Sequence, residues 1–180
     1  MYNAIWKKDA PRLHPIRELW RNEKINGSTI QRQIGESNTM LEVLLLLNAL
    51  WFFGGFVTFG PRGIIFAKKY VAREHRNTPA YELFLHTGSF MAGFNFAFMV
   101  LSILLLANIN AFDKDIQWSV VLAAIAVAHG SQFLGNVPTA IKNFRGEGVW
   151  NVWSGLMLLI FTVDFSLMAL NAIAASVFFF

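Results

Sequence analysis

The chain has 180 residues, of which 55% are hydrophobic and 14% are charged. Soluble domains average roughly 45–50% apolar and about 25% charged residues, so this composition argues against a soluble protein. The net charge is +4, but the basic residues lie in a tail and in loops beside apolar segments, which argues against a nucleic-acid-binding surface. The chain has no cysteine, which excludes disulfides, thiolate metal sites and cysteine nucleophiles.

The first 37 residues form a polar tail of mixed charge. Within it, Ile16, Leu19 and Trp20 share one helical face among basic residues. This spacing predicts a short amphipathic segment that would lie in the membrane interface. The alternatives are an ordinary solvated tail and an arm that docks on a partner.

Four apolar segments follow, and we interpret residues 38–180 as one transmembrane domain. The expected spans cover about 40–60, 80–110, 116–137 and 149–176. Each approaches or exceeds the length of about 20 residues that a helix needs to cross a bilayer. The sequence therefore predicts an all-α integral membrane protein with a bundle of four transmembrane helices.

Local signals set the expected ends of these spans. Gly60-Pro61 should end the first span, and Pro79 should open the second. Asn136-Val137-Pro138 should stop the third span before a polar loop. Between the first two spans, residues 63–75 carry apolar and basic side chains on different faces at helical spacing. This pattern predicts an interfacial helix.

The distribution of lysine and arginine favours one orientation. Loops 61–82 and 138–148 together contain seven basic residues, whereas only Lys24, Arg32 and Lys114 lie near the spans on the opposite side. Because cytoplasmic loops are enriched in such residues, we expect loops 61–82 and 138–148 to be cytoplasmic. The other basic residues of the tail favour the reverse orientation.

Asp164 is the only charged residue within the fourth span. An ionised Asp at a helix centre costs roughly 2.5–3.5 kcal/mol on insertion scales, so it must face the bundle, find a partner or be protonated. It points inward if the span packs along its 3–4 spaced seam, which consists of Trp150, Trp153, Met157, Ile160, Asp164, Leu167 and Asn171. Such a residue is a proton site, a ligand anchor or a counter-charge; the alternative is a purely structural hydrogen bond.

Other polar residues fall at similar depth in the remaining spans. In the third span, one helical face carries His129, Gln132 and Asn136, and the first and second spans contribute Asn48 and Asn95. We predict an intramembrane polar cluster or ligand-binding site made of Asp164, His129, Gln132, Asn136, Asn48 and Asn95. The competing interpretation is a set of interhelical hydrogen bonds, worth about 0.6 kcal/mol each on average.

His86 and His129 also suggest axial ligands of a haem b or a chlorin pigment. Their expected depths differ by roughly 7–8 Å, which is awkward for one shared haem. Hydrogen-bonded histidines are the simpler interpretation, and no cofactor is required by the sequence. Zinc and EF-hand spacings are absent, so no metal site is predicted.

No complete catalytic set is visible, and we therefore expect an accessory or structural subunit of a multi-subunit membrane complex, for example an electron-transfer or photosynthetic assembly. The alternative is a small membrane enzyme or a binder of a lipophilic ligand such as a quinone, a lipid, haem or a pigment. The expected partners are membrane lipid and other membrane subunits, and no nucleic acid is expected. A homo-oligomer is a further alternative.

Overall fold

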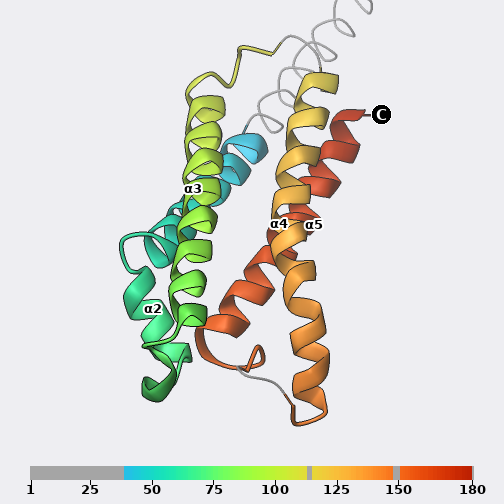
Figure 1. The fold of residues 1–180 in the computed structure, drawn as a ribbon. Coiled ribbons are helices and arrows are strands. Elements are labelled where there is room, and N and C mark those ends of the chain that lie inside the picture. Colours follow the sequence, from blue (N-terminus) through green and yellow to red (C-terminus); the bar gives the residue numbers. More distant parts are fainter. Residues whose placement is uncertain (1–38, 113–114, 148–150, 180) are drawn as a thin grey trace, which may run out of the picture. The chain divides into compact units, whose positions relative to one another are not determined.

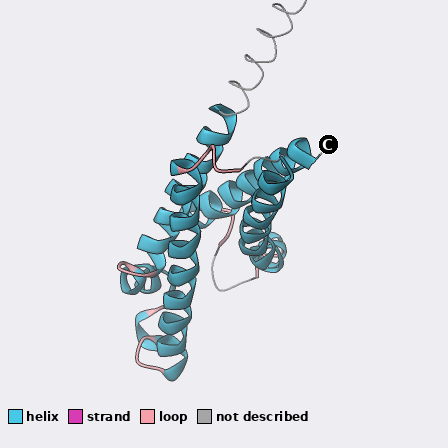
Figure 2. Ribbon diagram, turned by 90° about the horizontal axis from the view of Figure 1, so that it is seen from above, coloured by secondary structure: helices cyan, strands magenta, loops and turns pink. Residues whose placement is uncertain are grey.

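The structure is a computed structural model that describes residues 39–112, 115–147 and 151–179. Within these ranges the regular elements are all helices (Figure 2). Four are long and apolar enough to cross a membrane: Thr39–Phe59, α3 (Pro79–Ala107), α4 (Asp115–Phe144) and α5 (Gly155–Phe179). This confirms the all-α fold with four transmembrane helices and makes the chain a multi-pass membrane protein. The predicted amphipathic segment in residues 1–37 lies outside the described residues.

The connection after the first span contains a helix, as expected, but this helix ends at Tyr70 and does not continue to residue 75. The span ends at Phe59, directly before Gly60-Pro61, and α2 (Gly63–Tyr70) follows before the short 3₁₀ turn η1 (Arg73–His75). Figure 1 shows α2 beside the start of α3. The Phe66 ring on α2 packs 5.0 Å from the ring of Phe59, measured between centroids. This aromatic contact holds α2 against the end of the first span.

The start of α3 follows its local sequence signals. The hydroxyl of Thr78 accepts a hydrogen bond from the Tyr81 backbone N–H at 3.3 Å, and Pro79 occupies the first turn. An N-cap threonine followed by proline satisfies one orphan donor and removes another, so the predicted start is confirmed. The helix ends at Ala107, within a few residues of the expected position.

The expected end of the third helix at Pro138 is wrong, because α4 continues through this residue to Phe144. An internal proline costs about 3 kcal/mol, since it loses a backbone hydrogen bond. Tertiary contacts offset this cost: the Trp153 indole N–H donates to the Ala140 carbonyl at 3.0 Å, and the Trp153 ring packs 4.6 Å from that of Phe144. At about 1.5 Å per residue, α4 exceeds the bilayer core of about 30 Å, so the helix and the span need not end together.

The fourth helix starts later than expected, at Gly155 rather than near residue 149. Gly155 has a φ of 59°, a left-handed conformation that glycine adopts without a steric cost. Along α5 the buried positions include Met157, Asp164 and Leu167, which follow the predicted 3–4 spacing. Trp153, expected on the same seam, precedes α5 and is 39% exposed. Trp150 lies outside the described residues. Figure 1 shows α4 and α5 packed along each other.

The apolar core joins the first span to α3, α4 and α5. Its fully buried centre contains Phe52, Leu45, Leu122 and Ile125. One close crossing lies at Gly55, where a built Cβ would overlap the Asn95 side chain of α3. Large apolar side chains such as Phe90, 75% exposed, cover the outside, as expected for a surface that faces lipid.

Candidate functional site

Five polar side chains from three helices form one hydrogen-bonded group, here called the polar cluster. It consists of Asn48 and Trp51 from the first span, His129 from α4, and Asp164 and Asn171 from α5. Four of these residues are fully buried, and Trp51 is half-buried. Such a group holds the helices in register, because each buried polar atom that loses its partner costs about 1–3 kcal/mol.

Two asparagine side chains form one end of the cluster. Asn48 Nδ2 donates to Asn171 Oδ1 at 3.0 Å, and Asn171 Nδ2 donates back to Asn48 Oδ1 at 3.0 Å. Asn171 Nδ2 also donates to the Leu167 backbone carbonyl at 2.7 Å. The first span and α5 are therefore joined by a reciprocal amide pair that is anchored to the backbone.

His129 lies in the middle of the cluster. Its Nε2 is 2.9 Å from Asn48 Oδ1, and its Nδ1 is 3.3 Å from Asp164 Oδ1. The imidazole stacks on the Phe52 ring, with centroids 4.5 Å apart and 17° between the ring planes. Both ring nitrogens are thus engaged, and the stacking fixes the plane of the ring.

The two oxygens of Asp164 have different surroundings. Oδ1 accepts a hydrogen bond from the Trp51 indole N–H at 2.7 Å and also faces His129. Oδ2 is buried and has no hydrogen-bond partner among the described residues. Because most buried side-chain oxygens have a partner, this atom marks an incomplete site.

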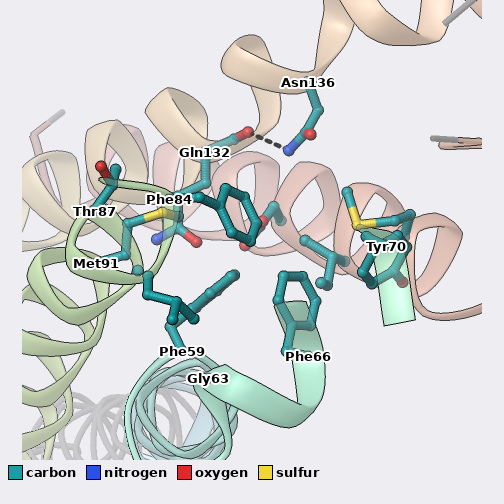
Figure 3. A pocket seen from close by; sticks show the side chains of 14 residues that line it. Phe59, Gly63, Phe66, Tyr70, Phe84, Thr87, Met91, Gln132 and Asn136 are labelled. Carbon is teal, nitrogen blue, oxygen red and sulfur yellow. Dashed lines mark hydrogen bonds between the residues drawn. The ribbon is translucent and has the colours of Figure 1, made fainter. Parts of the chain in front are cut away.

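Asp164 lies on the wall of a cavity of about 180 Å³, which is bordered by the first span and by α2, α3, α4 and α5. Figure 3 shows aromatic and apolar side chains converging on it from several of these helices. The wall is built from Phe59, Gly63, Phe66, Tyr70, Phe84, Leu85, Thr87, Gly88, Met91, Gln132, Asn136, Met157, Ile160 and Asp164.

A few polar groups interrupt the apolar wall. Thr87 and Asn136 use their donors on backbone carbonyls of their own helices, at 2.9 Å each. The Gln132 side chain makes no hydrogen bond within the described part of the chain, so its amide is available to a ligand. Burial raises the pKa of Tyr70, which keeps its phenol protonated at neutral pH.

A wider groove of about 570 Å³ runs between α3 and α4 and adjoins the cavity. The cavity and the groove share Met91, Gln132 and Asn136 as lining residues. The rest of the groove is lined by Phe94, Asn95, Phe98, Ala124, Val127, Ala128, Ser131 and Gly135. These shared residues lie where the smaller cavity meets the wider and more open groove.

The structure brings most of the predicted site residues together. Asp164, His129 and Asn48 belong to the polar cluster, whereas Gln132 and Asn136 lie with Asp164 on the cavity wall. Asn95 is buried but separate: its Nδ2 donates to the Met91 backbone carbonyl at 2.8 Å, and it lines the groove.

Two members of the cluster were missing from the predicted site. Asn171 lies on the α5 seam with Asp164, seven residues along, and Trp51 lies three residues after Asn48 on the same face. Helical spacing places both on inward faces. Spacing alone does not show that an indole N–H meets a carboxylate across the bundle.

The surroundings of the two histidines do not support an axial-ligand pair. His86 is exposed on α3, whereas His129 is fully buried with both ring nitrogens engaged in hydrogen bonds. A haem iron or chlorin magnesium at His129 would have to displace Asn48 or Asp164. Within the described residues, no three His, Asp or Glu side chains are grouped as metal ligands.

Comparison with protein-family models, with curated proteins and with solved structures finds no match to this chain. The chemistry of the cavity and the polar cluster is therefore the basis for a function.

Proposed function

We propose that this protein binds a lipophilic small molecule with a polar head group in the cavity beside Asp164. The observation that carries the proposal is that Asp164 borders this cavity while its Oδ2 atom is buried without a partner among the described residues. A carboxyl group with a purely structural role would use both oxygens within the protein. A bound head group completes the hydrogen bonding that the described side chains leave open.

The size and lining of the cavity define the ligand class. Its volume of about 180 Å³ is close to that of an engineered apolar cavity of about 150 Å³ that holds one benzene ring. Aromatic side chains such as Phe59, Phe66 and Phe84 suit the faces of a flat ring. The ligand is therefore a single substituted ring of the quinone or phenol class.

The groove between α3 and α4 gives such a ligand a path to the lipid. It adjoins the cavity at Met91, Gln132 and Asn136, and it is otherwise mostly apolar. The ring enters from the membrane through this groove, and an apolar tail on the ring lies in it. The bilayer then delivers the ligand directly to the site.

An accessory role in a larger membrane assembly is compatible with this proposal, because a subunit that holds a lipophilic ring can serve a partner that uses it. The exposed apolar surface, which includes Phe90 and Phe94, suits both lipid and neighbouring subunits. Ligand binding is the more specific function, since it explains the unpaired oxygen of Asp164.

The cavity lies at the end of the bundle formed by α2 and the start of α3, and we assign this end to the cytoplasm. Seven basic residues lie in or beside the connections at this end: Arg62, Lys68, Lys69, Arg73, Arg76, Lys142 and Arg145. On the opposite side, Lys114 lies in the short connection 108–114, and Lys24 and Arg32 lie in the tail near the first span. This asymmetry supports the assignment through the preference of cytoplasmic loops for positive charge.

The proposal is tested by binding of a single-ring amphiphile to the protein in lipid nanodiscs. The probes are 4-heptylphenol and its methyl ether, each labelled and measured by equilibrium dialysis against protein-free nanodiscs. At least one should bind saturably at one per chain. Ile160→Trp, which enlarges a wall side chain, should weaken this binding at least about tenfold, the equivalent of about 1.4 kcal/mol.

The matched control is Ile173→Trp on the same helix, where the side chain is 62% exposed and outside the cavity. This variant should bind the probe as the unmodified protein does. Absence of saturable binding for both probes, or equal binding by Ile160→Trp, would overturn the proposal.

A further inference from the structure

The hydrogen bonds of the polar cluster fix the orientation of its two amides. Asn171 Nδ2 must face the Leu167 carbonyl, because a reversed amide would set two carbonyl oxygens against each other at 2.7 Å. The Asn171 amide in turn orients Asn48 through their two reciprocal bonds of 3.0 Å. Amide orientations are assigned from such partners, and here a backbone carbonyl, which cannot turn, determines both.

The orientation of Asn48 determines the proton on His129 Nε2. Asn48 Oδ1 is an acceptor and lies 2.9 Å from Nε2, so Nε2 must carry a hydrogen and donate it. The other ring nitrogen, Nδ1, then faces Asp164 Oδ1 at 3.3 Å. Without a further proton, the lone pair of His129 Nδ1 would face a lone pair of Asp164 Oδ1 in the buried interior.

One proton therefore lies between His129 and Asp164. It resides on Nδ1, which makes an imidazolium beside a carboxylate, or on Oδ1, which makes a neutral pair. In both cases the pair has no net charge, as its complete burial requires. A proton on Oδ2 instead would leave Nδ1 facing an oxygen lone pair, so Oδ2 carries no hydrogen in either arrangement.

Asp164 Oδ2 is thus a hydrogen-bond acceptor that the described side chains leave without a donor, and Asp164 borders the cavity. We infer that the site selects a ring that carries a hydroxyl group, a phenol or the reduced quinol form, over the ether or ketone counterpart that has only acceptors. The hydroxyl donates to Oδ2, while Gln132, which is free on the wall, serves a second polar group of the ring. This inference rests on the proposed ligand binding and adds the chemistry of the head group.

The first test compares the two probes in the unmodified protein, which needs no variant. The phenol should bind at least about tenfold more tightly than its methyl ether, because a hydrogen bond to a buried acceptor is lost in the ether. Equal binding of both probes, with weaker binding of both to Ile160→Trp, would overturn this inference and leave the proposed function standing.

Asp164→Asn provides the second test, because it keeps the shape of the side chain and adds a donor. The Trp51 indole nitrogen lies 2.7 Å from Oδ1, closer than His129 Nδ1 at 3.3 Å. Because the indole N–H needs an acceptor, the amide oxygen of the variant should occupy the position of Oδ1. The amide NH₂ then faces the cavity. The preference for the phenol should disappear or reverse in this variant.

The double variant Trp51→Phe/Asp164→Asn should restore the preference. Without the indole donor, His129 Nδ1 is the remaining neighbour of the position that Asp164 Oδ1 occupies. The introduced amide NH₂ should take this position, because it donates a hydrogen bond to Nδ1. The amide oxygen then turns to the cavity and accepts from the phenol again. Trp51→Phe alone should keep the preference; size-exclusion chromatography and circular dichroism verify that each variant is folded.

The inference is overturned if Asp164→Asn retains the full preference for the phenol while folded, or if the double variant binds the ether as tightly as the phenol. A merely structural role of Asp164 would change stability in these variants but would not lose and regain selectivity for a hydroxyl group.

Discussion

The side chains of Asn48 and Asn171 are hydrogen-bond partners in both directions, although they lie 123 residues apart in the sequence. Because Asn48 Oδ1 also accepts from His129, one amide connects three helices. The loss of this amide leaves polar atoms on two other helices without a partner. The pair therefore contributes more to the free energy of unfolding than two single hydrogen bonds would.

Asn48→Leu should lower the free energy of unfolding by about 1–3 kcal/mol, because the His129 Nε2–H and Asn171 Oδ1 are left buried and unpaired. Asn171→Leu should cost a similar amount. The double variant should cost less than the sum of the two, since neither asparagine then remains as an orphan. Unfolding by sodium dodecyl sulfate in mixed micelles, followed by circular dichroism, measures all three.

Ser166→Ala is the control for this cycle, because Ser166 is exposed and bonds only to a carbonyl of its own helix. Its effect should stay within about 0.5 kcal/mol. Strictly additive costs for the two asparagine variants would show that the pair is not coupled.

Two neighbouring glycines should respond in opposite ways to alanine. A Cβ at Gly55 overlaps the Asn95 side chain, whereas a Cβ at Gly54 meets nothing within 4 Å. Gly55→Ala should therefore destabilise the protein by about 1–3 kcal/mol through overpacking. Gly54→Ala should be neutral or stabilising by up to about 1 kcal/mol, as alanine favours a helix.

The same unfolding assay tests the cause of the Gly55 effect. Asn95→Ala removes the overlapping side chain, so Gly55→Ala should cost much less in that background. An equal cost with and without the Asn95 side chain would contradict a steric origin.

The four long helices and the inward direction of Asp164 are predictable from the sequence. The helices follow from the length of the apolar segments, and the direction of Asp164 follows from the 3–4 spacing. The end of α4 was not predictable from Pro138, since Trp153 supplies contacts from beyond the next turn. The link from Asn48 to Asn171 also required the register of two helices, which spacing within each helix does not contain.

The cavity was even less accessible to sequence analysis. Gln132 and Asn136 were singled out because they are polar, but most of the wall is made of ordinary apolar residues such as Met157 and Ile160. Whether such residues fill a space or border it depends on how five helices meet. The unpaired state of Oδ2 likewise appears only when the partners of Asp164 are placed.

Narrowing the groove between α3 and α4 should slow ligand binding. Gly135 lines this groove, and a Cβ there meets nothing within 4 Å, so Gly135→Leu adds bulk to the groove from an open position. Stopped-flow mixing of nanodiscs with 4-heptylphenol, followed by tryptophan fluorescence, should show association slowed at least about tenfold, as an added barrier of about 1.4 kcal/mol produces.

The matched control is Gly93→Leu on α3, because its Cβ also meets open space but it lines neither the cavity nor the groove. Its association rate should equal that of the unmodified protein. If Gly135→Leu also binds at the unmodified rate, the ligand does not enter between α3 and α4.

The absence of cysteine allows a direct test of orientation, because one introduced thiol is then the only labelling site. Glu74→Cys and Glu147→Cys lie at the end of the bundle near the cavity, and Asn110→Cys lies in the connection at the opposite end; all three positions are exposed. None of them removes a basic residue, so the charge asymmetry that favours one orientation is preserved.

A membrane-impermeant maleimide should label Asn110→Cys in intact cells, whereas Glu74→Cys and Glu147→Cys should be labelled only after the membrane is permeabilised. The agreement of the two glutamate positions also tests the second and third spans, because these two crossings separate them. Labelling of Glu74→Cys and Glu147→Cys in intact cells, with Asn110→Cys protected, would place the cavity at the outer face of the membrane. The ligand would then have to partition from the outer leaflet.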